Sequence, residues 1–104
     1  MFVQRVVFHP TAGKAQELRA LLEERVKSAQ SQGRPAALSV QMFGADGGAY
    51  AMTLRYNTLA ELEERRSSLA SDSAFQAWAA KVAAVTRQPP EAHLAEVLIP
   101  FPAS

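Results

Sequence analysis

The sequence contains no cysteine, so neither a disulfide nor a thiolate metal site can form, and a reducing compartment is permitted. No apolar run approaches the roughly 18 residues that a membrane-spanning helix needs. The first ten residues, MFVQRVVFHP, lack a basic leader and place Gln4 and Arg5 inside the apolar stretch, so they predict a strand and not a signal peptide. These absences predict a soluble cytoplasmic protein with no membrane partner.

The sequence also has no large excess of positive or negative charge. Eleven basic and ten acidic residues leave a net charge of +1, and the basic residues form no run that could follow a phosphate backbone. Nucleic-acid binding is therefore not expected. Neither histidine has a metal-ligand spacing such as His-x-x-x-His, and the glycines of GADGG do not open a helix, so we expect no metal and no cofactor.

A chain of 104 residues predicts one domain, residues 1–104, with one hydrophobic core. Runs rich in valine and aromatic residues, or alternating between apolar and polar, predict strands, and apolar residues three and four apart predict helices. GADGG predicts the turn of a hairpin. The expected strands are 2–9, 37–43, 50–56 and 93–99. One helix is expected after Thr11 and before Gly33, a second after Thr58 and before the break at 71–73, and a third after that break and before QPP at 88–90.

Local signals place the helix ends. Thr11 is expected to cap the first helix, and Thr58 with Glu61 forms a capping-box pattern before the second. The segment SDS at 71–73 breaks the helical pattern, and Asp72 or Ser73 can cap the piece that follows. The run ELEERR at 61–66 predicts a solvated helix face with an ion pair between Glu61 and Arg65. The first helix has an inward face of Ala15, Leu18, Leu21, Leu22, Arg25, Val26 and Ala29.

The element order β-α-β-β-α-β is typical of an α+β ferredoxin-like sandwich with sheet order 4-1-3-2. Successive side chains of a strand point to opposite faces of the sheet. Sorting the strand residues in this way predicts one apolar face, which the helices cover, and one face of mixed apolar and charged residues. On the mixed face we expect Arg5, Arg55 and Glu96 to form a charge-compensated row across neighbouring strands. Such a face suits an interface with a second copy of the chain, although the arginines could instead bind an anionic substrate.

The element order and two segments, FHPTAGKAQELRALLEE and YAMTLRYNTLAELEERRSSLASDSAFQAWAAKV, resemble the dimeric α/β-barrel superfamily. The nearer resemblance is to NIPSNAP-like proteins, and antibiotic-biosynthesis-monooxygenase-like proteins are more distant. In these families two sheets pack face to face into a closed barrel with helices outside. The resemblance therefore implies a homodimer that forms a dimeric α/β barrel.

Several side chains could build a site. We predict that strands one and three run parallel and end at the edge where strand four begins, which would bring His9, Tyr56, Asn57 and His93 near one another for acid-base work or to share a metal. Strand parity places His9 and His93 on opposite faces, so a structural or surface role for each histidine is the favoured alternative. The aromatic residues could line a pocket between the sheet and the helices, or could simply fill the core. The candidate pocket comprises Tyr50, Tyr56, Asn57, Phe75, Trp78 and His9.

Two functions remain open. One is a NIPSNAP-like small-molecule-binding or accessory protein without a catalytic residue set. The other is a cofactor-independent monooxygenase that acts on an aromatic or polyketide-like substrate, as the resemblance to the more distant relatives implies. Both predict a small hydrophobic or aromatic ligand.

Overall fold

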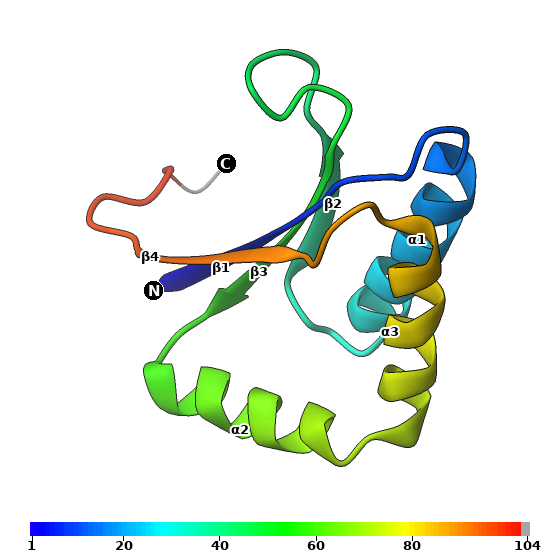
Figure 1. The fold of residues 1–104 in the computed structure, drawn as a ribbon. Coiled ribbons are helices and arrows are strands. Elements are labelled where there is room, and N and C mark those ends of the chain that lie inside the picture. The colour runs from blue at the N-terminus through cyan, green and yellow to red at the C-terminus, as the bar shows by residue number, and fades with distance from the viewer. Residues whose placement is uncertain (103–104) are drawn as a thin grey trace.

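A computed structural model describes residues 1–102 and has an α+β fold of four strands and three helices. Figure 1 shows their arrangement. The sheet order is β2-β3-β1-β4, which confirms the predicted 4-1-3-2 order of a ferredoxin-like sheet. The elements are β1 (Phe2–Phe8), α1 (Ala15–Ser31), β2 (Ala36–Val40), β3 (Tyr50–Tyr56), α2 (Leu59–Ala70), α3 (Ser73–Val85) and β4 (Glu91–Glu96).

All neighbouring strands are antiparallel, so the expectation that β1 and β3 run parallel is wrong. In the register of β1 with β3, Phe8 lies opposite Tyr50 and Phe2 lies opposite Tyr56. The hairpin between β2 and β3 is confirmed, because the Gln41 N–H donates to the Ala49 carbonyl (2.9 Å) and the Gly48 N–H donates to the Gln41 carbonyl (2.8 Å). Gly48 has a φ of 86°, a conformation that glycine adopts without steric cost.

The start of α1 differs from the prediction. Lys14 occupies the N-cap position and makes no side-chain cap, and Thr11 lies outside the helix. The Thr11 N–H donates to the Val85 carbonyl (2.9 Å), so this residue ties the chain to the end of α3. A turn with Gly13 at a φ of 82° then leads into the helix. Among residues 1–102, no helix combines the length and apolar composition needed to cross a bilayer.

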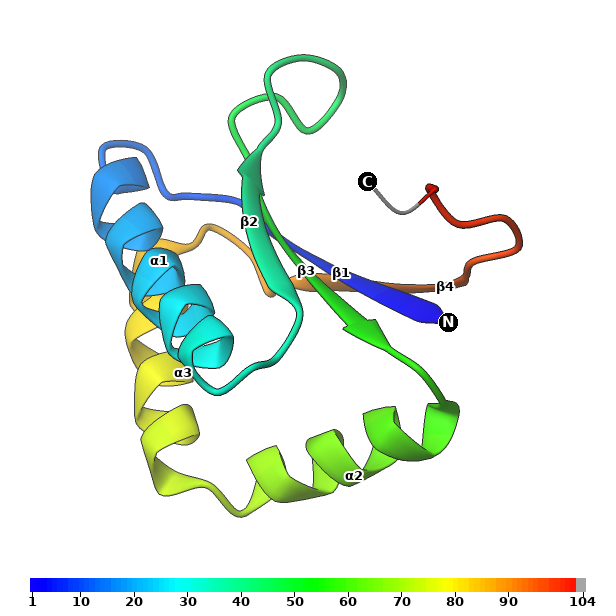
Figure 2. The same cartoon turned by 180° about the vertical axis from the view of Figure 1, so that it is seen from behind.

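Two helices cover one face of the sheet. Helices α1 and α3 lie side by side on this face, whereas α2 runs below them and stands away from the sheet (Figures 1 and 2). The core lies between the sheet and the α1–α3 pair. Its buried members are Phe8, Leu18, Leu22, Val26, Tyr50, Met52, Val82 and Val85. Within residues 1–102, no helix lies on the opposite face of the sheet (Figure 2).

The expected charge row is not formed, because the register of β4 differs from the parity that we assigned. His93 lies opposite Arg5, and Glu96 lies opposite Phe2. Glu96 is therefore on the helix-facing side of the sheet, while Arg5 and Arg55 are on the other side. Arg5 instead donates to the Gln41 side-chain oxygen (3.2 Å). All six residues of β4 are exposed, so no buried face fixed the parity of this strand.

Candidate functional site

A cavity of about 560 Å³ opens between the sheet, α2 and the α1–α3 pair. A volume of this size is typical of sites that enclose a small organic ligand. Most of the wall is apolar, and its aliphatic and aromatic side chains include Val6, Phe8, Val26, Met52, Leu54, Leu69 and Val82. Within Leu59–Ala70, Leu62 is the buried residue, at 5% exposed. Helix α2 therefore covers the cavity without packing tightly onto the sheet.

The corner between β3 and α2 holds that helix in place. The Thr58 hydroxyl oxygen accepts a hydrogen bond from the Glu61 N–H (3.2 Å), and the Glu61 carboxylate accepts one from the Asn57 N–H (2.9 Å). This is a capping box whose return bond reaches one residue before the N-cap. The Asp72 carboxylate caps α3 through the N–H groups of Ala74 and Phe75 (2.9 and 3.1 Å). Both caps confirm the sequence prediction, and together they fix the α2 segment at its two ends.

An aromatic pair forms the wall on the α3 side. The Phe75 and Trp78 ring centroids are 5.7 Å apart, and Trp78 meets Phe8 edge-on at 6.5 Å. The Trp78 indole N–H donates to the Leu21 carbonyl (2.9 Å), which satisfies its one polar group and fixes the ring. The Arg25 guanidinium carbon lies 5.0 Å from the Phe75 centroid and 5.5 Å from that of Trp78. These are cation–π distances.

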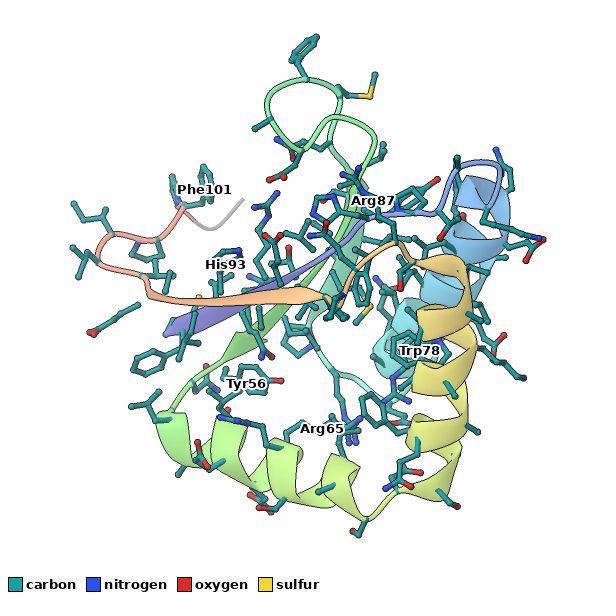
Figure 3. All side chains as sticks on the ribbon, in the orientation of Figure 1. Tyr56, Arg65, Trp78, Arg87, His93 and Phe101 are labelled. Atoms are coloured by element: carbon teal, nitrogen blue, oxygen red, sulfur yellow. The ribbon has the colours of Figure 1, made fainter. Side chains whose placement is uncertain are left out.

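Four arginines line the same cavity: Arg25 from α1, Arg34 from the α1–β2 loop, Arg65 from α2 and Arg55 from β3. Arg55 occupies a strand position on the other face of the sheet, so the first three form the cluster on the cavity side. Within residues 1–102, none of them has a carboxylate oxygen within 4 Å. The ion pair expected between Glu61 and Arg65 is also absent there, because Glu61 is engaged by the Asn57 N–H. Figure 3 shows Arg65 and Tyr56 directed into the space between α2 and the sheet.

The pKa values report how these groups affect one another. Burial lowers the pKa of Arg65 below its ordinary value, and the positive charges of Arg34 and Arg25 lower it further. The pKa of Arg25 is lowered in the same way, mainly by burial and also by Arg34, while Asp72 opposes the shift. Burial raises the pKa of the Tyr56 phenol, against the smaller opposite effects of Arg65 and Arg34. Tyr56 is therefore a neutral hydrogen-bond donor at physiological pH.

The structure brings together only part of the predicted pocket. Tyr56, Phe75 and Trp78 line the cavity, and Tyr50, Asn57 and His9 do not. Tyr50 is buried in the core near the far end of the sheet, and His9 follows β1 at that same end, because β1 and β3 are antiparallel. Tyr56 and Asn57 lie at the opposite end of the sheet. The expected grouping of His9, Tyr56, Asn57 and His93 is therefore wrong.

His9 has a different environment from the one expected. The residue is 6% exposed, and its Nε2 atom lies 3.5 Å from Glu91 and 3.9 Å from Asp46. Its Nδ1 atom lies 3.4 Å from an Arg87 nitrogen, while Nε2 has no hydrogen-bond partner in the described part of the chain. No group of three or more histidine, aspartate or glutamate side chains in residues 1–102 is arranged to hold a metal ion.

Sequence reasoning missed the arginine cluster, although two signals were present. Arg25 falls on the inward face of α1 between Leu22 and Val26. Arg65 lies three residues after Leu62 and four before Leu69, which places it on the inward side of α2. A basic residue at an inward position indicates either a buried ion pair or a ligand site.

No protein-family model matches the sequence, and neither does any curated protein. Solved structures do match the fold. A NIPSNAP domain protein from Burkholderia xenovorans has a TM-score of 0.80 at 18% identity and covers 99% of this chain and 100% of its own. A NIPSNAP family protein from Agrobacterium tumefaciens has a TM-score of 0.74 at 23% identity, covering 91% and 90%. An antibiotic biosynthesis monooxygenase has a TM-score of 0.72 at 15% identity, covering 95% and 100%. The chain therefore has the fold shared by NIPSNAP and antibiotic biosynthesis monooxygenase structures.

Proposed function

We propose that the protein binds a small organic molecule in the cavity beneath α2. The observation that carries this proposal is a largely apolar chamber of about 560 Å³ with a few convergent polar groups, Tyr56 and four arginines among them. Binding sites commonly combine apolar walls with a small number of orienting polar groups. The NIPSNAP structures of similar fold support a NIPSNAP-like binding or accessory role.

Native mass spectrometry of gently purified protein tests this proposal. We expect a discrete retained mass that is lost when the chamber is filled by Ala79→Phe, since Ala79 lines the cavity. The exposed Ala80→Phe on the same helix is the matched control. Retention of the same mass by both variants, each folded, would place the ligand elsewhere.

A second candidate function is a cofactor-independent monooxygenase that acts on an aromatic or polyketide-like substrate. The specific observation in its favour is that the Tyr56 phenol faces the same chamber as Phe75 and Trp78. Because burial raises its pKa, the phenol could donate a hydrogen bond to a developing enolate or phenolate oxygen. The substrate would supply the electrons: a ring CH₂ becomes a carbonyl as O₂ gives one oxygen to it and one to water.

Oxygen uptake with a panel of anthrone- and quinol-like substrates tests the second candidate. We expect uptake to fall sharply in Tyr56→Phe and to persist in Tyr50→Phe, whose tyrosine does not line the cavity. Absence of uptake across the panel by the intact protein would remove the oxygenase function and leave the binding function.

We further propose a homodimer through the sheet face that α1 and α3 leave free of helices. Large apolar side chains at the hairpin tip and after β4 support it: Met42 is 77% exposed, Phe43 85%, Ile99 90% and Phe101 99%. Both segments lie on the side of the sheet away from α1 and α3 (Figures 1 and 2). An exposed apolar surface of this kind is typical of an interface.

The subunit number from native mass spectrometry tests the homodimer. We expect a dimer that Phe43→Asp weakens. Leu59→Asp serves as the control because Leu59 is an exposed apolar residue of α2, on the other side of the sheet. A monomeric intact protein would overturn the sheet-to-sheet interface.

A further inference from the structure

Three of the four arginines in the cavity lining form an uncompensated cluster of positive charge. Arg25, Arg34 and Arg65 reach the cavity from separate elements, and within residues 1–102 none has an ion-pair partner. The Arg25 guanidinium lies above the Phe75 and Trp78 rings. Three like charges converge on one partly apolar space, an arrangement that is unfavourable unless an anion is present.

The acidic groups nearby are engaged elsewhere. Glu61 lines the cavity, but its carboxylate accepts the Asn57 N–H at the start of α2. Asp72 approaches Arg25 and Arg65 but caps α3 through two N–H groups. Glu64 is the remaining carboxylate of the lining. Four arginines, with Arg55 included, against two glutamates leave the lining with two net positive charges, which favours an anionic ligand.

We propose that the cavity binds a small organic carboxylate with an aromatic or aliphatic body, held through its carboxylate by Arg34 and Arg65. This inference rests on the proposed binding function and names its ligand class. The Tyr56 hydroxyl lies in the same lining as a neutral donor, and Arg25 is fixed over the aromatic pair as a third positive charge. Guanidinium groups match the planar geometry of a carboxylate, and the apolar walls receive the body of the ligand.

A matched pair of probes separates charge from shape. Naphthalene-2-carboxylate and naphthalene-2-carboxamide have nearly the same size, and binding is read from the fluorescence of Trp78, which is the single tryptophan of the chain and lines the cavity. We expect the carboxylate to bind about tenfold more tightly or better, and added salt to reduce this preference.

Arginine variants locate the effect. Arg34→Met and Arg65→Met should each weaken carboxylate binding about tenfold, with little change for the amide. Arg66→Met is the matched control on α2, because Arg66 does not line the cavity and its guanidinium lies 3.6 Å from Glu63. Thermal unfolding of each variant confirms that it is folded before titration.

Each outcome bears on a different claim. Equal binding of both probes to the intact protein would overturn the carboxylate inference and leave a neutral-ligand site. Tighter binding of 2-naphthyl phosphate than of the carboxylate would also overturn it. An equal loss in Arg66→Met would refute the assignment to the cavity. Binding of neither probe, within a series of acid and amide pairs from benzoate to naphthoate, would overturn the proposed binding function as well.

Discussion

Arg65→Met should leave the ligand-free protein as stable as the natural chain, or make it more stable. The charge of Arg65 is disfavoured where it lies: burial is the largest cause of its lowered pKa, and Arg34 and Arg25 add repulsion. Methionine keeps an unbranched apolar stem, has a helix propensity close to that of arginine, and extends the inward side of α2 formed by Leu62 and Leu69. Within residues 1–102 Arg65 makes no ion pair that the substitution could remove.

The expected gain is small because Arg65 is only half-buried. Screening by solvent limits the gain to about 0–1 kcal/mol in the free energy of unfolding. For a domain of this size, 1 kcal/mol corresponds to roughly 4–8 °C in Tm. Arg66→Met should change stability by less than about 0.5 kcal/mol, since it removes an exposed ion pair with Glu63.

The order of stabilities should reverse when ligand is added. A ligand at 100 times its Kd stabilises the protein that binds it by about 2.7 kcal/mol, so naphthalene-2-carboxylate should raise the Tm of the natural protein above that of Arg65→Met. The assay is thermal and urea unfolding at one fixed protein concentration, with and without the acid. A loss of more than about 1 kcal/mol in ligand-free Arg65→Met would refute the reasoning, because Arg65 would then have a structural partner.

Three further perturbations test the surrounding structure. An ultraviolet titration measures the ionisation of Tyr56 as the tyrosine signal that is missing in Tyr56→Phe. The pKa of Tyr56 should lie above the ordinary value of about 10, and Arg65→Met should raise this pKa further because the positive charge that lowers it is lost. The stability that this raised pKa contributes is fully present below pH ~10 and is lost as the pH rises through the folded-state pKa. Ionisation of Tyr56 below pH ~10 would contradict the raised pKa. Thr58→Ala should cost about 0.5–2 kcal/mol by urea unfolding through loss of the α2 cap, and Thr58→Ser should restore most of it. Leu22→Ala should cost about 2–5 kcal/mol, and a cost under 1 kcal/mol would argue against the core assignment.

Much of the fold was predictable because its signals are local. The capping residues Thr58 and Asp72 act on backbone N–H groups within three residues, so their roles depend little on the rest of the chain. The hairpin around GADGG is local as well. The direction of β1 relative to β3 is a property of the whole topology, and the error there placed His9 and Tyr56 at the same end of the sheet.

The parity of β4 failed for a physical reason. Alternation reveals a strand's inward face only where one face is buried, and Glu91–Glu96 is exposed throughout. Its register is set instead by pairing with β1, which no pattern within the strand records. As a result, Glu96 was predicted on the same sheet face as Arg5, but it lies on the face that α1 and α3 cover.

The cavity electrostatics depend on one local competition that the sequence leaves undecided. Glu61 lies four residues before Arg65, a spacing suited to an exposed ion pair, and also three residues after Thr58, a spacing suited to a capping box. An exposed ion pair contributes a few tenths of a kcal/mol, whereas a helix cap contributes about 1 kcal/mol, so the cap is preferred. The carboxylate accordingly accepts the Asn57 N–H at 2.9 Å. The same bond that anchors α2 at the corner after β3 thus leaves Arg65 without its helical partner, and its positive charge is directed to the cavity.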